Sequence, residues 1–506
     1  MIKFLIDYVT NRPGTGELED EGVDPGDVVG QKEEAAFRQI LKAKRADAIK
    51  EFDQRPAKKM QDALRGRHER HSVYHLQLGR GHLSANRQLA METNDRRSPG
   101  AQTALALLLA INLFNYIDRQ VLAAVEPQIR DTFFAATNRN AMFTTGLLGS
   151  AFLVTYMLAA PALGWLSDRF SRWIIIGSAV IVWSLASGAS GLAATFGALL
   201  ITRIFVGIGE GGYGPAAPTV LADLFPLQTR GRVMAVFCAA IPVGSALGYV
   251  LGGWISEHFG WRWTFYLLTP PGLLLGLFCF TQHDPRTRAL ARPERQRASL
   301  QDYVSLVRTR SYILNCIAQT ALTFAIGGIA FWMAAYLRFR GQPISATKFF
   351  GVIIVAAGLS STLLGGWVGD RFRKRWPGSY FLVSAIGMVI AFPLLVVFLF
   401  TPFPAAWFLM FAAVFFMFLN TGPSNTALAN VTLPKVRASA FALNILVIHL
   451  FGDVAAFPTI GFIAGHTNMT IAFLFVSVIM LVGAVAWFAG VKYLPGDTAK
   501  VEAATV

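Results

Sequence analysis

The chain has 506 residues, of which 54% are hydrophobic and only 15% are charged, and its mean hydropathy is +0.47. About a quarter of the residues of a typical soluble domain are charged, so this composition excludes an ordinary soluble globular protein. The net charge of +15 does not indicate a nucleic-acid-binding protein, because Lys and Arg lie beside apolar segments and form no basic groove interleaved with aromatic residues.

Residues 1–98 form a polar N-terminal extension that is too rich in charge to cross a membrane. The apolar stretch 1–8 is too short for a signal peptide, and residues 35–64 are compatible with an amphipathic helix. Two explanations stay open. Either the extension is a disordered or surface-associated cytoplasmic segment, or translation starts at Met91 and residues 1–90 are not part of the native protein.

Twelve long apolar runs follow the extension. A helix of about 20 apolar residues is long enough to cross the hydrocarbon layer, and so many runs cannot share one soluble core. We therefore predict an all-α membrane protein with twelve transmembrane helices in two six-helix bundles. The expected spans are 102–124, 143–166, 174–193, 197–221, 232–255, 263–281, 312–337, 347–368, 379–400, 405–429, 438–462 and 470–491.

These runs divide the chain into an N-terminal bundle at 99–281 and a C-terminal bundle at 311–494, joined by a polar linker at 282–310 and followed by a tail at 495–506. The linker carries seven arginines, and further Lys and Arg follow spans 2, 4, 8 and 10. Excess Lys and Arg in short loops mark the cytoplasmic side. We expect both termini and the linker to be cytoplasmic, although Arg338 and Arg340 after span 7 oppose the trend, and we expect the plasma (inner) membrane as the location.

The two halves repeat each other. GWLSDRFSRW after span 2 matches GWVGDRFRKRW after span 8, so that Asp168 aligns with Asp370 and Arg169 with Arg371. A Gly-Pro pair in span 4 and another in span 10 are each followed by a second proline at the same distance. Shared signatures at equivalent places indicate duplication, as in transporters whose halves rock about a central site.

Ionisable residues inside spans are costly in a membrane, so each is a candidate functional residue. Span 1 contains Asp118 and Arg119, span 4 contains Arg203 and Glu210 on one helix face, and span 11 contains His449 and Asp453 one turn apart. Burial favours the neutral form of a carboxyl group and a nearby cation favours the ionised form.

A carboxyl group held between these two influences can exchange a proton, so Asp118 and Glu210 are the predicted proton carriers. The guanidinium groups of Arg119 and Arg203 do not deprotonate and are predicted to serve as counter-charges or anion anchors, and His449 is suited to either task. The alternative is that these are buried ion pairs that only fix helix packing.

Other polar side chains within the spans are candidates for lining a substrate cavity. They are Asn115, Tyr116, Tyr213, Gln319, Thr323, Asn420, Asn425 and Asn444. Taken singly, such a residue more often makes a hydrogen bond between helices than a contact with a ligand. The cysteines lie in apolar segments without metal or disulfide spacing, and we find no nucleophile–base pair, metal-ligand set or phosphate-binding lysine loop. We expect no enzyme activity, no metal and no cofactor.

The paired GxxxDRxxR-type loops resemble the signature of the major facilitator superfamily. The resemblance implies that Asp168, Arg169, Asp370 and Arg371 are gating residues that latch the two halves together on the cytoplasmic side. More narrowly, INLFNYIDR, RIFVGIGEGGYGPAAPTVLADLF, AIPVGSALGYVLGG and HLFGD resemble the Spinster-type lysolipid and sphingolipid-phosphate transporters. The general resemblance covers residues 101–494, and the chain departs from the subfamily at Gly211-Gly212, where Ala-Ser is expected.

The resemblance implies an amphiphilic substrate with an anionic or zwitterionic head group, and proton binding at Asp118 or Glu210. Our leading prediction is therefore a secondary transporter that moves lysophospholipid- or sphingoid-like amphiphiles by alternating access, linked to protons. The substrate-binding or counter-charge residues are predicted to be Arg119, Arg203, Tyr116, Tyr213, Asn444, His449 and Asp453. The alternatives are a proton symporter of small organic anions, such as sugar acids or aromatic acids, and a membrane receptor or scaffold without transport activity.

Overall fold

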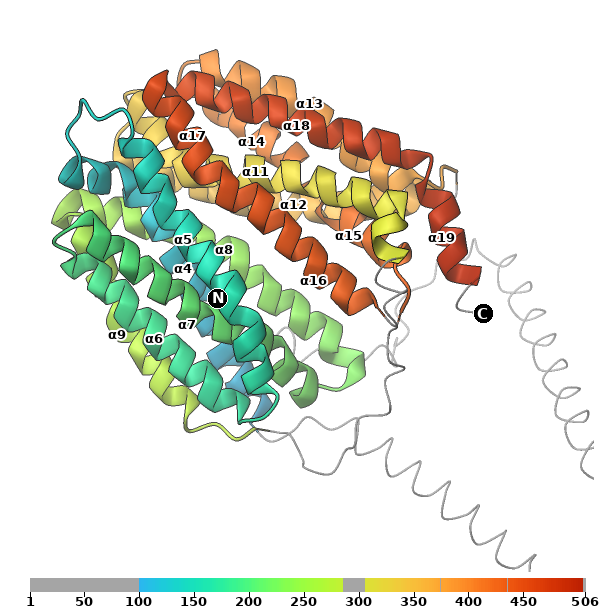
Figure 1. Ribbon diagram of the computed structural model, residues 1–506, viewed down its shortest axis with the longest axis horizontal. Coiled ribbons are helices and arrows are strands. Elements are labelled where there is room, and N and C mark those ends of the chain that lie inside the picture. The colour runs from blue at the N-terminus through green and yellow to red at the C-terminus, as the bar shows by residue number, and fades with distance from the viewer. Residues whose placement is uncertain (1–99, 285–304, 374, 435, 504–506) are drawn as a thin grey trace, which may run out of the picture. The chain divides into compact units, whose positions relative to one another are not determined.

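The computed structural model describes residues 100–284, 305–373, 375–434 and 436–503, and these belong to one compact unit. All regular structure in this part of the chain is helical (Figure 1). The N-terminal extension, with the amphipathic segment and the Met91 start discussed above, lies outside the described residues, as does linker segment 285–304.

The N-terminal bundle consists of six helices. They are α4 (Ala101–Phe133), α5 (Ala141–Ser167), α6 (Arg172–Leu192), α7 (Phe196–Leu224), α8 (Leu227–Phe259) and α9 (Trp261–Cys279). Within it α4 packs on α8, α5 on α7, and α6 on both α7 and α9. Two helices begin at a side-chain cap. The side chain of Thr195 accepts a hydrogen bond from the backbone N–H of Ala198 at the start of α7. In the other bundle, the side chain of Asn468 accepts one from the backbone N–H of Ile471 at the start of α18 (Met469–Val491).

The C-terminal bundle repeats this arrangement with two interrupted spans. Its helices are α11 (Arg310–Phe339), α12 (Thr347–Arg373), α13 (Ser379–Phe400), α14 (Ala405–Phe418), α15 (Thr421–Asn430), α16 (Arg437–Ile448), α17 (Val454–His466) and α18 (Met469–Val491). Span 10 is divided into α14 and α15, and span 11 contains a π-helical turn, η2 (His449–Asp453), between α16 and α17. After span 12 the chain forms a short helix, α19 (Leu494–Ala503), within the expected tail.

The packing pattern of one bundle recurs in the other. The first helix of the C-terminal bundle, α11, packs on the span formed by α16, η2 and α17, as α4 packs on α8. In the same way α12 packs on α14 and α15, and α13 packs on α18. This correspondence, together with the repeated sequence signatures, confirms the predicted pair of pseudo-symmetric six-helix bundles.

Ten helices of the described part are long and apolar enough to cross a bilayer. The other two spans are the less apolar α7 and α9. Arg203, Glu210 and several glycines lower the hydropathy of α7, and α9 is short and begins with Trp-Arg-Trp. Both pack among the other helices of their bundle, and the side chains of Arg203 and Glu210 are buried within it.

The bundles meet through α5 with α17, α8 with α12, and α4 with α11. The polar contacts between the bundles lie in the half of the structure in which α4, α8 and α17 finish, and we call this half the closed end. There Ser150 donates to the carbonyl of Val454 at 2.7 Å, Tyr249 donates to the carbonyl of Ala330 at 2.5 Å, and Arg338 pairs with Asp131 at 2.5 Å.

Toward the opposite end α16 exposes Leu443, Ile445 and Leu446, which are 38–49% accessible, and this helix stands apart from the N-terminal bundle in Figure 1. We call this the open end. The polar contacts between the bundles thus lie toward the closed end, whereas α16 carries exposed apolar side chains toward the open end.

Glycine permits the closed-end contact between α8 and α12. A Cβ at Gly351 would lie 2.8 Å from the carbonyl oxygen of Ala246 across the bundle interface, whereas a Cβ at Gly366 of the same helix would meet nothing within 4 Å. We expect Gly351→Ala to destabilise the protein by about 1–3 kcal/mol through overpacking.

Gly366→Ala should leave stability unchanged or raise it, because alanine favours the helix. Thermal unfolding of the two purified variants tests this expectation. An equal or higher midpoint for Gly351→Ala would show that the closed end is not packed as described.

Candidate functional site

Ionisable residues from α4 and α7 are brought together in the middle of the N-terminal bundle. Asp118 and Arg119 are neighbours on α4, and Arg203 and Glu210 lie two turns apart on α7. The pairing is crossed between the helices, because the acid of each helix lies against the base of the other. Arg119 Nε donates to Glu210 Oε2 at 2.7 Å, and Arg203 Nη1 lies 3.9 Å from Asp118 Oδ2.

The Asp118–Arg203 pair is buried deep in the bundle, with side chains 5% and 2% exposed. Helix α6 supplies its remaining polar contacts: Ser187 donates a hydrogen bond to Asp118 Oδ1, and Arg203 Nη2 donates to Ser190 Oγ at 2.6 Å. The Arg203 guanidinium carbon also lies 5.2 Å from the centre of the Phe265 ring. Four helices therefore hold this pair, and the contacts fix both side chains.

The Arg119–Glu210 pair is more accessible on its cationic side. The carboxylate of Glu210 is fully buried, whereas the Arg119 side chain is 21% exposed. Three aromatic rings surround the guanidinium of Arg119, with ring centres 5.0 Å away for Tyr116 and Phe152 and 5.1 Å away for Tyr156. Such cation–π contacts hold the charge at the site while one face stays available to a ligand.

Both pairs face a cavity of about 340 Å³ between the two bundles. Its N-terminal wall carries Tyr116, Asp118, Arg119, Arg203 and Glu210. Its C-terminal wall carries Gly327, Ala330, Phe331, Ile445, His449, Asp453 and Phe457. The N-terminal wall also includes apolar residues such as Leu122, Phe152, Leu153, Met157 and Val206. Both walls therefore combine apolar side chains with ionisable groups, and the C-terminal wall has one ionisable patch.

That patch is the His449–Asp453 pair on the π-helical turn η2. His449 Nδ1 lies 2.6 Å from Asp453 Oδ2, and the side chains are 36% and 13% exposed. Gly327 of α11 leaves the space that the Asp453 carboxylate occupies, because any Cβ there would collide with its Oδ1. The π-helical turn and the glycine together place an imidazole at the cavity surface opposite Arg119.

Two predicted site residues lie away from the cavity lining. Tyr213 is buried and donates to the carbonyl of Leu108 at 2.8 Å, and its ring packs edge-on against Trp183. Asn444 is buried and donates to Gln319 Oε1 at 2.7 Å, and Gln319 donates in turn to Ser424 Oγ at 3.0 Å. In this conformation both residues take part in hydrogen bonds between helices.

The four predicted gating residues lie exposed at the open end, where α5 and α12 finish. Arg169 rests on the Trp165 ring, 3.6 Å from its centre, and Tyr380 donates to Asp370 at 2.7 Å. Asp168 and Arg371 project from the same two helix ends. All four therefore lie exposed at the same end of the structure.

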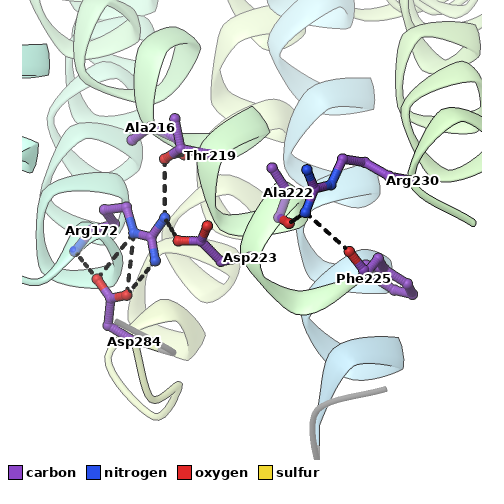
Figure 2. A network of polar contacts seen from close by, with 8 residues as sticks. All are labelled: Arg172, Ala216, Thr219, Ala222, Asp223, Phe225, Arg230 and Asp284. Atoms are coloured by element: carbon purple, nitrogen blue, oxygen red, sulfur yellow. Dashed lines mark hydrogen bonds and ion pairs between the residues drawn. The ribbon is translucent and has the colours of Figure 1, made fainter. Parts of the chain in front are cut away.

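The buried charge at this end is Arg172, which the sequence suggested only as a loop charge. Figure 2 shows its guanidinium between Asp223 at the end of α7 and Asp284 after α9. Nη1 lies 2.6 Å from Asp223 and Nη2 lies 2.5 Å from Asp284, while the side chain is 0% exposed. The separate Arg230 in Figure 2 donates to the carbonyl of Ala222 and so ties the start of α8 to α7. These contacts join four helix ends of the N-terminal bundle.

The sequence did not indicate which side chains contact the charged pairs and hold them in place. Ser187, Ser190, Phe152 and Tyr156 are ordinary residues of apolar spans, and no motif marks them. A second buried acid of α4, Glu126, accepts from Thr145 Oγ1 at 2.6 Å and lies beyond residue 124, where the predicted span 1 ends. Counting charges over the full length of that helix would have found it.

Comparison with known proteins identifies the fold and relatives. The family model described as "Major Facilitator Superfamily" matches residues 108–452. "Protein spinster homolog 1" of Homo sapiens is 33% identical over 401 residues, covering 72% of this chain and 74% of the relative. The "Sphingosine-1-phosphate transporter SPNS2" of Xenopus tropicalis is 31% identical over 385 residues, covering 72% and 74%.

Solved structures agree on the fold. A bacterial homologue of the human lysosomal transporter Spinster, in an inward-facing and unoccupied conformation, superposes with a TM-score of 0.70 at 21% identity, covering 79% of this chain and 99% of that one. A D-xylose–proton symporter superposes with a TM-score of 0.63 at 19% identity, covering 76% and 96%.

Removing the base of the deeper ion pair tests whether the two charges depend on each other. Arg203→Met leaves Asp118 buried without its cation, and breaking a buried pair from one side costs about 3–5 kcal/mol. We expect a clear fall in the thermal unfolding midpoint of Arg203→Met. The double variant Asp118→Asn/Arg203→Met should recover most of the loss, because no charge is then left unpaired. A midpoint equal to that of the unmodified protein for Arg203→Met alone would contradict the pairing.

Proposed function

Since the chain belongs to the Spinster family of the major facilitator superfamily, we propose that it is a proton-linked transporter of lysophospholipid- or sphingoid-like amphiphiles that works by alternating access. The observation that carries the proposal is the two-sided cavity. Arg119 offers a partly exposed cation beside Glu210, and Phe331, Ala330 and Phe457 provide apolar surface on the facing wall, which also carries His449 and Asp453. An amphiphile with an anionic head and a hydrocarbon chain matches both walls.

The crossed pairs provide a route to proton coupling. While Glu210 is ionised, Arg119 is engaged by its carboxylate at 2.7 Å. Protonation of Glu210 removes that charge and frees the guanidinium to bind the anionic head of a substrate. Substrate and proton then enter together, and their release restores the internal pair. Protonation of Asp118 releases Arg203 in the same way, at a pair that lies deeper in the bundle. Tyr116 and His449 contact the head group from the side.

The two ends of the protein have different roles in the proposed alternating-access cycle. The closed end, joined by Arg338–Asp131 and the glycine contacts, would face outward in an inward-open protein whose termini are cytoplasmic, in the plasma membrane. At the open end, Asp168, Arg169, Asp370 and Arg371 would meet when the bundles rock together and latch that side. Arg172, held by Asp223 and Asp284, keeps the ends of the N-terminal bundle rigid enough to move as one body.

Symport of small organic anions is the second candidate. The aromatic rings of Tyr116, Phe152 and Tyr156 around Arg119 would suit the carboxylate and ring of an aromatic acid. The apolar side chains on both walls favour the lipid-like substrate, because a small acid leaves most of them uncovered.

Glu210→Gln tests the proton link. The amide keeps the shape and a hydrogen-bond acceptor for Arg119 but cannot change charge, so transport in proteoliposomes should lose its dependence on pH. The protein should still fold. Glu257→Gln, which alters an exposed carboxyl at the end of α8, is the matched control and should keep the pH dependence. Unchanged pH dependence in Glu210→Gln would remove this residue from the mechanism.

A competition panel decides between the two substrate classes. Lysophospholipids and sphingoid phosphates should compete with a labelled lysolipid at concentrations at least about tenfold lower than aromatic or sugar acids, because each buried methylene adds affinity. Competition by the small acids alone would favour the second candidate. Arg119→Met should weaken competition by either class of anion.

A further inference from the structure

Glu126 is a buried acid without a role in the transport cycle proposed above. Its side chain on α4 is 1% exposed, and Oε1 accepts a hydrogen bond from Thr145 Oγ1 of α5 at 2.6 Å. Arg130, one turn further along α4, places Nη1 3.8 Å from Oε1. The other oxygen, Oε2, is buried and has no hydrogen-bond partner within the described residues. An ionised carboxyl that is only partly paired inside a membrane-spanning helix is costly, and binding a proton removes that cost.

Glu126 lies between two cavities on one face of α4. It follows Arg119 by seven residues, which is about two helical turns, so the two side chains share a face. Leu122 and Ala123, which stand between them, line the central cavity. Arg130 lines a second cavity, of about 490 Å³, at the closed end. Glu126 is therefore placed between the central site and the closed-end cavity, and Arg130 reaches from that cavity to its carboxyl.

Arg338 of α11 holds this part of α4 across the interface between the bundles. Its Nη1 pairs with Asp131 at 2.5 Å and also donates to the carbonyl of Pro127, the residue after Glu126, at 3.2 Å. Arg130, Asp131 and Arg338 all line the closed-end cavity. The contact that keeps α4 and α11 together at this end is thus made on the same stretch of α4 that carries the buried acid.

The charges around Glu126 balance only while it is ionised. Those that act on its carboxyl belong to Arg130, Asp131 and Arg338. With Glu126 ionised, the two cations face two anions, and with Glu126 protonated they face Asp131 alone. The uncompensated positive charge then lies on α4 beside Arg338, and like charges repel. Because coupling between two groups is reciprocal, an ionised Glu126 holds Arg338 against α4 and a protonated one does not.

The remaining ionisable residues around this end make contacts elsewhere or face solvent. Arg262 of α9 donates to the carbonyl of Ala193, and Arg340 of α11 donates to the carbonyl of Leu399. The exposed residues are Arg139, Glu257, His258, Lys348 and His466. In the part of the chain that the structure describes, none of these forms an ion pair with Glu126.

From this arrangement we infer that Glu126 is a second proton-binding site, whose ionised form keeps the closed end shut through Arg338 and whose protonation lets that end open. The inference rests on the proposed alternating-access cycle and adds a proton site outside the central pairs. A proton taken up from the closed-end cavity would favour separation of α11 from α4. Acid on the closed side would thus favour the conformation that opens toward it.

A distance measured across the closed end tests the inference. Ala194, between α6 and α7, and Ala405, at the start of α14, are exposed at this end and belong to different bundles. Spin labels at both positions, after replacement of Cys238, Cys279 and Cys316, report the separation of the bundles. Pulsed electron resonance over a pH series gives the ratio of long to short distances. In the otherwise unmodified labelled protein, acidification should raise this ratio.

Glu126→Gln imitates the protonated acid. At the alkaline end of the series it should raise the ratio of long to short distances at least about fivefold, and at the acidic end it should match the unmodified protein. Glu257→Gln, which alters an exposed carboxyl at the same end, is the matched control and should leave every ratio unchanged. Equal ratios for Glu126→Gln and the unmodified protein at alkaline pH would overturn the inference.

Arg338→Met separates a proton switch from an acid that only supports the fold. Its side chain is 53% exposed, and the variant removes the partner while Glu126 stays in place. Adding Glu126→Gln to Arg338→Met should change the ratio by less than about twofold, because the two residues act as a unit. A full additional increase would overturn the coupling. If Glu126→Gln fails to fold, Arg338→Met alone should weaken the response to acidification, and an unchanged response would overturn the inference.

The distance measurement needs no transported substrate, so the two proposals fail separately. If pH-dependent lysolipid transport persists while Glu126→Gln leaves the distances unchanged, the proton site at Glu126 is overturned and the proposed function stands. If the distances respond as expected but no lysolipid is transported, the proton site stands and the proposed function is overturned.

Discussion

The crossed ion pairs between α4 and α7 are the constraint on which the rest of the structure depends. Each ionised side chain near the centre of a bilayer costs about 2.5–3.5 kcal/mol on insertion scales, and these two helices carry four. Pairing each acid with a base on the other helix offsets that cost only when the two helices are held in one register. The serines of α6 and the ring of Phe265 secure this register, so the N-terminal bundle is built around its charges.

The two pairs differ in ways that suit different tasks. Asp118 and Arg203 are enclosed by protein, whereas Arg119 keeps one face toward the cavity. The exposed pair is therefore the one that a ligand can reach directly, and the buried pair fixes the scaffold beneath it. The C-terminal bundle contributes an apolar wall and the His449–Asp453 patch, while its own polar residues, such as Asn444 and Gln319, are used in hydrogen bonds between helices.

Close contact between the bundles depends on small residues. At the closed end, backbone atoms of one bundle lie where a Cβ of the other would stand, as at Gly146 against the carbonyl of Phe457 and Gly351 against that of Ala246. Small residues of this kind let the backbones of the two bundles approach closely, and the contacts rest on van der Waals packing instead of polar groups. The Arg338–Asp131 pair adds a charge interaction at the surface of the same end, where both side chains are about half exposed and the contribution is modest.

The sequence by itself determined that this is a membrane protein, that it has twelve spans and that its two halves are duplicated. It also determined which ionisable residues lie inside the spans. Those features follow from local properties: length and hydropathy decide what crosses a bilayer, and a charge within an apolar run is visible without a structure. It also placed Arg203 and Glu210 on one face, because helical periodicity is local.

Only the tertiary structure decided which charges pair. The sequence offered Asp118 and Arg119 as neighbours, yet their partners on α7 lie 85 and 91 positions away in the chain. It likewise decided that Tyr213 and Asn444 turn away from the cavity and that Arg172 is buried between Asp223 and Asp284. These outcomes depend on the rotation of each helix about its axis, which is set by packing among all its neighbours and not by the pattern of one segment.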